Sequence, residues 1–189
     1  MIISHRHKFV FIKTRKTAGS TLESLLFPFL GEEDVCTGSA RDGTPALNIL
    51  EGSDGHAVPS PITGYFSFSI ERNPWDKVVS SYFWHKQEVK GLLDVSFKDY
   101  IVKHKRYLPT DWGKYGGCDK VYLYEDMREM YKELNERFCL DIDISQLETV
   151  RLKSGTKRVA DYRKMYNEDT KSIIADRFSN EIERFGYEF

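Results

Sequence analysis

The segment that decides the fold covers residues 8–26 and reads KFVFIKTRKTAGSTLESLL. Its first part, residues 9–12, is a short apolar run rich in β-forming residues and predicts a buried strand. Its last part spaces three leucines and the following Phe29 along one helical face, which predicts a helix over residues 20–29. The residues between them include cations, hydroxyls and one glycine, so the segment predicts a strand, a tight loop and a helix.

The predicted loop is chemically suited to hold an anion. The first N–H groups of a helix lack partners within the helix, and the helix dipole adds partial positive charge there. Glycine lets the backbone approach a ligand closely, and hydroxyls and ammonium groups donate hydrogen bonds to it. We therefore predict a phosphate-binding loop made of Lys16, Thr17, Ala18, Gly19, Ser20 and Thr21. Lys13 or Arg15 either adds a second cation or contacts solvent at the strand edge.

A second segment repeats this arrangement. Residues 65–70 alternate large apolar with small residues and predict another strand. Asn73 suits the cap of the next helix, Pro74 suits its first position, and Asp76 suits the positive end of its dipole. Arg72 stands at the turn, so a cation again lies between a strand and a helix.

The remaining pattern predicts an α/β protein with a P-loop-like central parallel β-sheet flanked by helices, in one domain over residues 1–189. We predict a further strand at 119–124, helices at 96–104, 127–138, 160–166 and 168–178, and a loop at 32–63 with a short helix at 45–50. Ligands of such sheets bind at the carboxyl ends of the strands. Both cationic turns fall at such ends.

Composition narrows the class of protein. The 28 Lys and Arg residues nearly balance 29 Asp and Glu residues. The chain therefore has no overall positive charge that would favour binding to nucleic acid. Three distant cysteines favour reduced thiols, and no apolar run is long enough to span a membrane. Without room for a signal peptide, we expect a cytoplasmic protein. His5 and His7 could face one metal, but exposed residues are the commoner explanation, and we expect no metal.

The loop does not fit the nucleoside-triphosphatase motif GxxxxGK[ST]. Gly19 is its only glycine, no Lys-Ser or Lys-Thr pair follows it, and Lys16 precedes it. The hydroxyl that binds Mg²⁺ in that mechanism is therefore missing from its place.

Residues 16–21 instead resemble the 5′-phosphosulfate loop of the sulfotransferases that use 3′-phosphoadenosine 5′-phosphosulfate (PAPS). In that family an arginine after a later strand and a serine eight residues on grip the 3′-phosphate, and Arg72 and Ser80 match this spacing. Residues 72–82 and 161–187 are most similar to the carbohydrate 2-O- and chondroitin-type branch, whereas 35–64 and 86–117 match it loosely. We expect no membrane anchor like that of the Golgi members, and the chain resembles a short, soluble bacterial or viral form.

This resemblance implies sulfuryl transfer from PAPS to a hydroxyl, or an amine, of a glycan-like or small-molecule acceptor, leaving adenosine 3′,5′-bisphosphate (PAP). Lys16 would stabilise the bridging oxygen, residues 17–21 would hold the 5′-phosphate, and Arg72 would take the 3′-phosphate. The alternative for Lys16 is a solvated surface lysine, and the alternative for Arg72 is a structural salt bridge. Ser154 and Lys157 either cover the nucleotide or belong to an ordinary polar turn.

The general base is predicted to be His56, which lies in a glycine-rich loop and matches a histidine of the 2-O-sulfotransferase branch. An exposed surface histidine is the alternative. Glu71, Glu125 and His85 are further candidates, although Glu71 could pair with Arg72 and Glu125 could be buried at a strand end. A second hypothesis is a nucleotide-binding protein or small kinase that performs no sulfuryl transfer.

Overall fold

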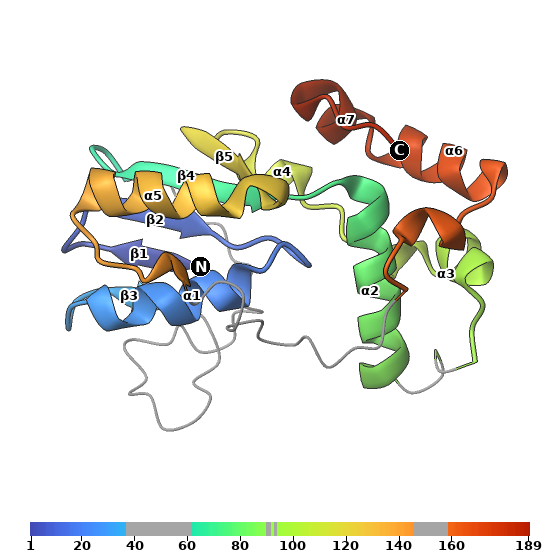
Figure 1. Ribbon diagram of the computed structural model, residues 1–189, viewed down its shortest axis with the longest axis horizontal. Coiled ribbons are helices and arrows are strands. Elements are labelled where there is room, and N and C mark those ends of the chain that lie inside the picture. The colour runs from blue at the N-terminus through green and yellow to red at the C-terminus, as the bar shows by residue number, and fades with distance from the viewer. Residues whose placement is uncertain (37–61, 90–91, 93, 146–158) are drawn as a thin grey trace. The chain divides into compact units, whose positions relative to one another are not determined.

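The computed structural model describes residues 1–36, 62–89, 92, 94–145 and 159–189 (Figure 1). It has an α/β fold with a five-stranded sheet and flanking helices. The chain forms two compact units. We call Met1–Glu71 with Gly113–Leu152 the sheet unit, and Arg72–Trp112 with Lys153–Phe189 the helical unit.

The strands are β1 (Ile2–Ser4), β2 (Phe9–Ile12), β3 (Val35–Cys36), β4 (Phe66–Glu71) and β5 (Lys120–Leu123). The α-helices are α1 (Gly19–Leu26), α2 (Pro74–Glu88), α3 (Phe97–Lys103), α4 (Trp112–Tyr115), α5 (Met127–Phe138), α6 (Glu168–Arg177) and α7 (Ser179–Phe185). Short 3₁₀ turns cover Phe27–Phe29, Lys105–Tyr107, Tyr124–Asp126 and Tyr162–Met165. None of these α-helices combines the length and apolar character needed to cross a membrane.

The sheet has the strand order β3-β1-β2-β4-β5 and is mixed. Strands β2, β4 and β5 are parallel, as the alternation of strands and helices predicts. Strands β1 and β3 add an antiparallel edge that the sequence analysis did not predict. A four-residue turn at residues 5–8 joins β1 to β2, and so short a connection can only join antiparallel neighbours. Because β2 and β4 are parallel neighbours, their carboxyl ends at Ile12 and Glu71 lie at the same edge of the sheet.

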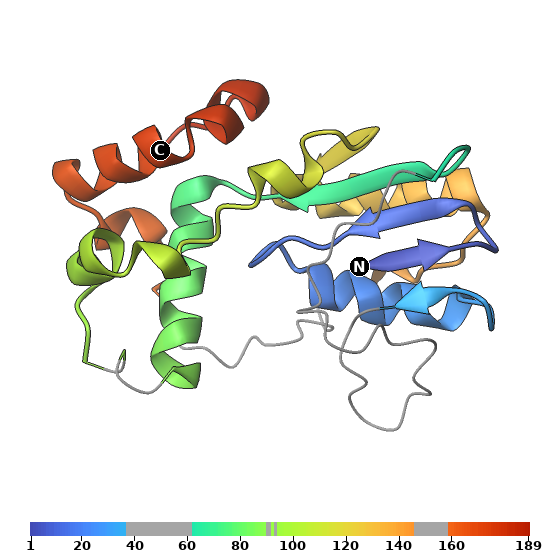
Figure 2. The same cartoon turned by 180° about the vertical axis from the view of Figure 1, so that it is seen from behind.

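The core of the sheet unit lies between the strands and two helices. Alternate side chains of the parallel strands form one core cluster with residues of α1 and α5. Both helices lie on the same face of the sheet (Figures 1 and 2). The fully buried contributors include Phe9, Phe11, Phe68, Ile70, Leu22, Leu26, Met130, Tyr131 and Leu134. The leucine spacing of residues 8–26 therefore fixes the side of α1 that faces the sheet, and with it the direction of the loop before α1.

The helical unit is built around α2. The helix begins as predicted, because Asn73 accepts hydrogen bonds from the amides of Trp75 and Asp76 through its side chain. Its buried face contains Trp75, Val78, Val79 and Tyr82, which pack with residues of α3 and α6. The predicted helix at 160–166 is only a 3₁₀ turn over Tyr162–Met165, and its hydrogen bonds end before the Asn167 cap of α6.

Candidate phosphate-binding site

The loop between β2 and α1 has an unusual backbone. Lys16 and Ala18 have φ angles of 64° and 62°, whereas Thr17 between them does not have a positive φ. A side chain in the left-handed region costs about 1–2 kcal/mol, so two such residues in three are a strained arrangement. Successive backbone N–H groups in a turn that contains left-handed residues can form an anion-binding concavity. The residue types of the loop predict an anion site but give no sign of this strain.

Helix α1 begins immediately after this strained stretch without a side-chain cap. The carbonyl of Ala18 accepts the amides of Thr21 and Leu22, at 2.9 and 3.1 Å, and the first turn contains no acidic residue. Within the part of the chain that the structure describes, the amides of Gly19 and Ser20 have no hydrogen-bond acceptor. Two unsatisfied donors at the positive end of a helix dipole attract an anion.

Two buried threonines tie the loop to the sheet. The hydroxyl of Thr14 donates to the carbonyl of Ile70 in β4 at 2.6 Å, and it lies 2.9 Å from the hydroxyl of Thr17. The Thr17 hydroxyl also donates to the Thr14 carbonyl. The hydroxyl of Thr17 therefore points into the protein, whereas its backbone amide belongs to the loop. Sequence reasoning missed Thr14, because a threonine after a strand has no pattern that distinguishes it from its neighbours.

Gly19 lies against the side chain of Lys13. A Cβ at this position would lie 2.8 Å from Cγ of Lys13, closer than real Cβ contacts allow. The aliphatic part of Lys13 thus crosses the start of α1, and its ammonium forms an ion pair with the buried Glu23. The amino group of Met1 contacts the other oxygen of the same carboxylate at 2.8 Å. Lys13, Arg15 and Lys16 are all half-buried.

The second cationic turn lies in the helical unit. Nε of Arg72 donates to Oδ2 of Asp76 at 2.8 Å, and one terminal nitrogen of Arg72 donates to the same oxygen. The Arg72 side chain is 8% exposed. Ser80 lies one turn beyond Asp76 on α2 and is half-buried, so these two residues share one side of the helix. Arg72 precedes the Asn73 cap and contacts Asp76 in the first turn.

The described candidates for a general base have different surroundings. Glu71 is fully buried at the end of β4 and accepts the hydroxyl of Tyr115. Glu125 is exposed just after β5, so the suggestion that it is buried at a strand end is wrong. Nδ1 of His85 lies 2.9 Å from the hydroxyl of Tyr100, within a polar cluster on the inner side of α2. The other predicted site residues, His56, Ser154 and Lys157, and the predicted helix at 45–50, lie outside the described residues.

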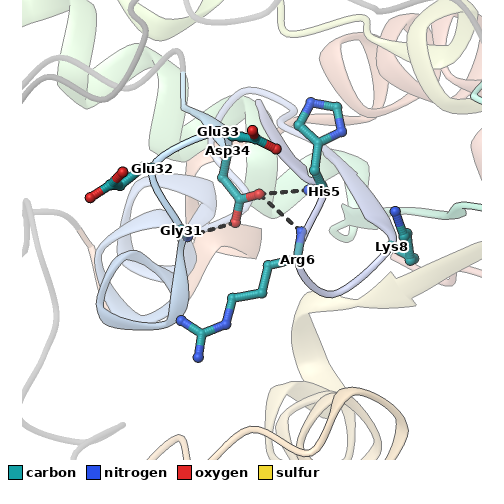
Figure 3. Close-up of a pocket in the computed structure, with 7 residues that line it drawn as sticks. All are labelled: His5, Arg6, Lys8, Gly31, Glu32, Glu33 and Asp34. Carbon is teal, nitrogen blue, oxygen red and sulfur yellow. Dashed lines mark hydrogen bonds between the residues drawn. The ribbon is translucent and has the colours of Figure 1, made fainter.

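A separate hollow in the sheet unit is lined by His5, Arg6, Lys8, Gly31, Glu32, Glu33 and Asp34 (Figure 3). At its centre Asp34 accepts the amides of His5, Arg6 and Gly31 and the hydroxyl of Ser4. Burial alone would raise the pKa of Asp34, but these hydrogen bonds outweigh burial and lower it. Asp34 therefore joins the β1–β2 turn to the turn before β3.

The two N-terminal histidines bind protein groups. Nδ1 of His5 lies 2.8 Å from the hydroxyl of Tyr65, and the two ring nitrogens of His7 lie 3.2 and 3.1 Å from the carbonyls of Phe138 and Phe29. No cluster of three or more His, Cys, Asp or Glu residues suited to a metal occurs among the described residues.

No known protein family matches the chain, and no solved structure matches it significantly. An uncharacterized protein of the archaeon Archaeoglobus fulgidus is similar to part of the chain. The two are 29% identical over 94 residues, which cover 43% of this chain and 78% of the archaeal protein.

Proposed function

We propose that the protein is a PAPS-dependent sulfotransferase that transfers a sulfuryl group to a hydroxyl, or an amine, of a glycan-like or small-molecule acceptor. The observation that carries this proposal is the strained loop at Lys16–Ala18, which leads into an uncapped helix at the carboxyl end of β2. That loop supports an anion site of the P-loop-like kind without the Lys-Ser or Lys-Thr pair that serves Mg²⁺. The neighbouring parallel strand β4 continues directly into Arg72.

The loop is suited to the 5′ end of the nucleotide. The amides of Gly19 and Ser20 and the hydroxyls of Ser20 and Thr21 would donate to the 5′-phosphate, and Thr17 would contribute its amide. Lys16 would neutralise the negative charge that grows on the 5′-phosphate as it leaves. Preorganised donors of this kind do not have to reorient during the reaction, and loss of one typically costs about 10²–10³ in rate.

Arg72 and Ser80 are suited to the 3′-phosphate. A guanidinium can grip a phosphate with two parallel hydrogen bonds, which a lysine cannot reproduce. We expect Arg72→Ala to weaken PAP binding far more than binding of adenosine 5′-phosphate, which has no 3′-phosphate. Isothermal titration with the two nucleotides measures this difference, and an equal loss for both would contradict the assignment.

PAPS supplies an activated sulfuryl group, which moves to the acceptor as the S–O bond to the 5′-phosphate breaks and PAP leaves. The protein must then position the acceptor in line and remove its proton. We assign proton removal to His56, with Glu71, Glu125 and His85 as alternatives. Of the three described alternatives, Glu71 and His85 already bond to tyrosine hydroxyls. Full turnover by a His56→Ala variant that still binds the nucleotide would remove His56 from this role.

A further inference from the structure

The ion pair between Arg72 and Asp76 holds the arginine in one orientation. Nε and one terminal nitrogen of Arg72 donate to the same oxygen of Asp76, and both side chains are largely buried, at 8% and 14% exposure. We propose that Asp76 is a positioning residue that presents Arg72 to the 3′-phosphate. This inference rests on the proposed function and adds a residue to it.

Asp76 can fix an arginine because its own backbone is anchored. The side chain of Asn73 accepts the amides of Trp75 and Asp76 and donates to the carbonyl of Glu188 at 2.9 Å. The indole N–H of Trp75 donates to the carbonyl of Lys171 at 3.1 Å. The first turn of α2 is therefore tied to the C-terminal segment and to α6 within the helical unit.

The geometry of the guanidinium decides which edge is presented. Arginine carries five N–H donors in a planar fork, and Asp76 takes the edge that includes Nε. A phosphate gripped by two parallel hydrogen bonds would use the edge formed by the two terminal nitrogens. Asp76 therefore directs that edge away from itself and restricts the rotamers of a long, flexible side chain before the ligand arrives.

The negative charge of Asp76 acts in the opposite direction, because a carboxylate close to a bound phosphate repels it. Orientation and charge can be separated by two substitutions. In Asp76→Asn the amide oxygen still accepts from Nε while the charge is lost, whereas in Asp76→Ala both are lost. If orientation dominates, asparagine keeps the preference for a 3′-phosphate and alanine does not.

The test is isothermal titration of PAP and of adenosine 5′-phosphate into the protein and its variants. The two nucleotides differ only in the 3′-phosphate, so the ratio of their affinities measures the contribution of that phosphate. A general loss of stability weakens binding of both nucleotides and leaves the ratio unchanged. We expect Asp76→Ala to lower this ratio about tenfold, as expected for releasing a rotamer-rich side chain, and Asp76→Asn to stay within about threefold of the unchanged protein. Asp76→Ser, also too short to reach Arg72, replaces alanine if that variant does not fold.

Asp99 provides a matched control. It stands in the first turn of α3 in the same unit and forms an ion pair with Lys103 four residues on, at 2.7 Å. Asp99→Ala loses a comparable helix-end charge and should leave the ratio unchanged. An unchanged ratio in Asp76→Ala, or an equal fall in Asp76→Asn and Asp76→Ala, overturns the role of Asp76 alone. A protein that shows no preference for the 3′-phosphate before any substitution overturns the proposed function, and the role of Asp76 with it.

Discussion

The left-handed backbone at Lys16 leads to a prediction that is opposite in sign to the usual rule. Replacing a residue by glycine normally destabilises a protein relative to alanine, by about 0.5–1 kcal/mol, because glycine loses more backbone entropy on folding. At Lys16, with φ of 64°, alanine must keep a Cβ in the left-handed region and glycine need not. We therefore expect Lys16→Gly to be more stable than Lys16→Ala.

The magnitude follows from comparison with the adjacent Arg15, whose φ is not positive. At Arg15 the alanine variant should be more stable than the glycine variant by about 0.5–1 kcal/mol. At Lys16 the left-handed penalty of about 1–2 kcal/mol is added in favour of glycine. The difference between the two positions therefore equals that penalty, and the loss of a cation cancels within each pair of variants.

The assay must follow the sheet unit, which contains this loop. The three tryptophans, at positions 75, 84 and 112, all belong to the helical unit, so their fluorescence reports the other half of the chain. Hydrogen exchange of the β2 and β4 amides gives the free energy of opening of the sheet itself. If glycine is less stable than alanine by the same margin at both positions, the strained-loop reasoning is refuted.

Two further changes in the sheet unit have expected outcomes. Tyr131→Phe should stabilise the protein by about 1 kcal/mol or more in urea unfolding, because the buried Tyr131 hydroxyl has no hydrogen-bond partner among the described residues. Tyr115→Phe removes a donor to buried Glu71 and should instead cost about 1–3 kcal/mol. Equal effects of the two substitutions would contradict this assignment. Asp34→Asn should cost about 2 kcal/mol at pH 7. Because the pKa of Asp34 is lowered, the stability that its charge contributes is complete above the ordinary pKa of 3.8 and is lost as the pH falls below that value. The cost of Asp34→Asn should therefore shrink in acid. A cost that is constant with pH would show that the charge of Asp34 is irrelevant.

Much of the fold could be predicted because the local signals are strong. The apolar run at residues 9–12, the Asn73 cap before Pro74 and the periodic apolar face of residues 127–138 correspond to β2, α2 and α5 as observed. Strands β1 and β3 were missed because three and two residues are too short to show a period. They pair only because a four-residue turn brings β1 back against β2.

The geometry of the candidate site could not be predicted from its residues. The residue types in the loop indicated an anion, yet the positive φ of Lys16 and Ala18 has no signature in residues that are not glycine. The approach of Gly19 to a ligand stays a prediction, and the structure adds that a Cβ at this position would collide with Lys13. The pairing of Arg72 with Asp76 was not predicted, because Arg72 precedes the helix, and the structure shows that both side chains are largely buried.

The most direct test of the central claim is nucleotide binding without metal. PAP and ATP are titrated separately into the protein, each in the presence of chelator and again with Mg²⁺, and binding is followed by calorimetry and by thermal stabilisation. We predict that PAP binds and stabilises the protein equally with and without Mg²⁺, and that ATP binds more weakly. Stabilisation by ATP only in the presence of Mg²⁺, with no effect of PAP, would contradict the assignment as a PAPS-dependent sulfotransferase and favour a kinase-like nucleotide enzyme.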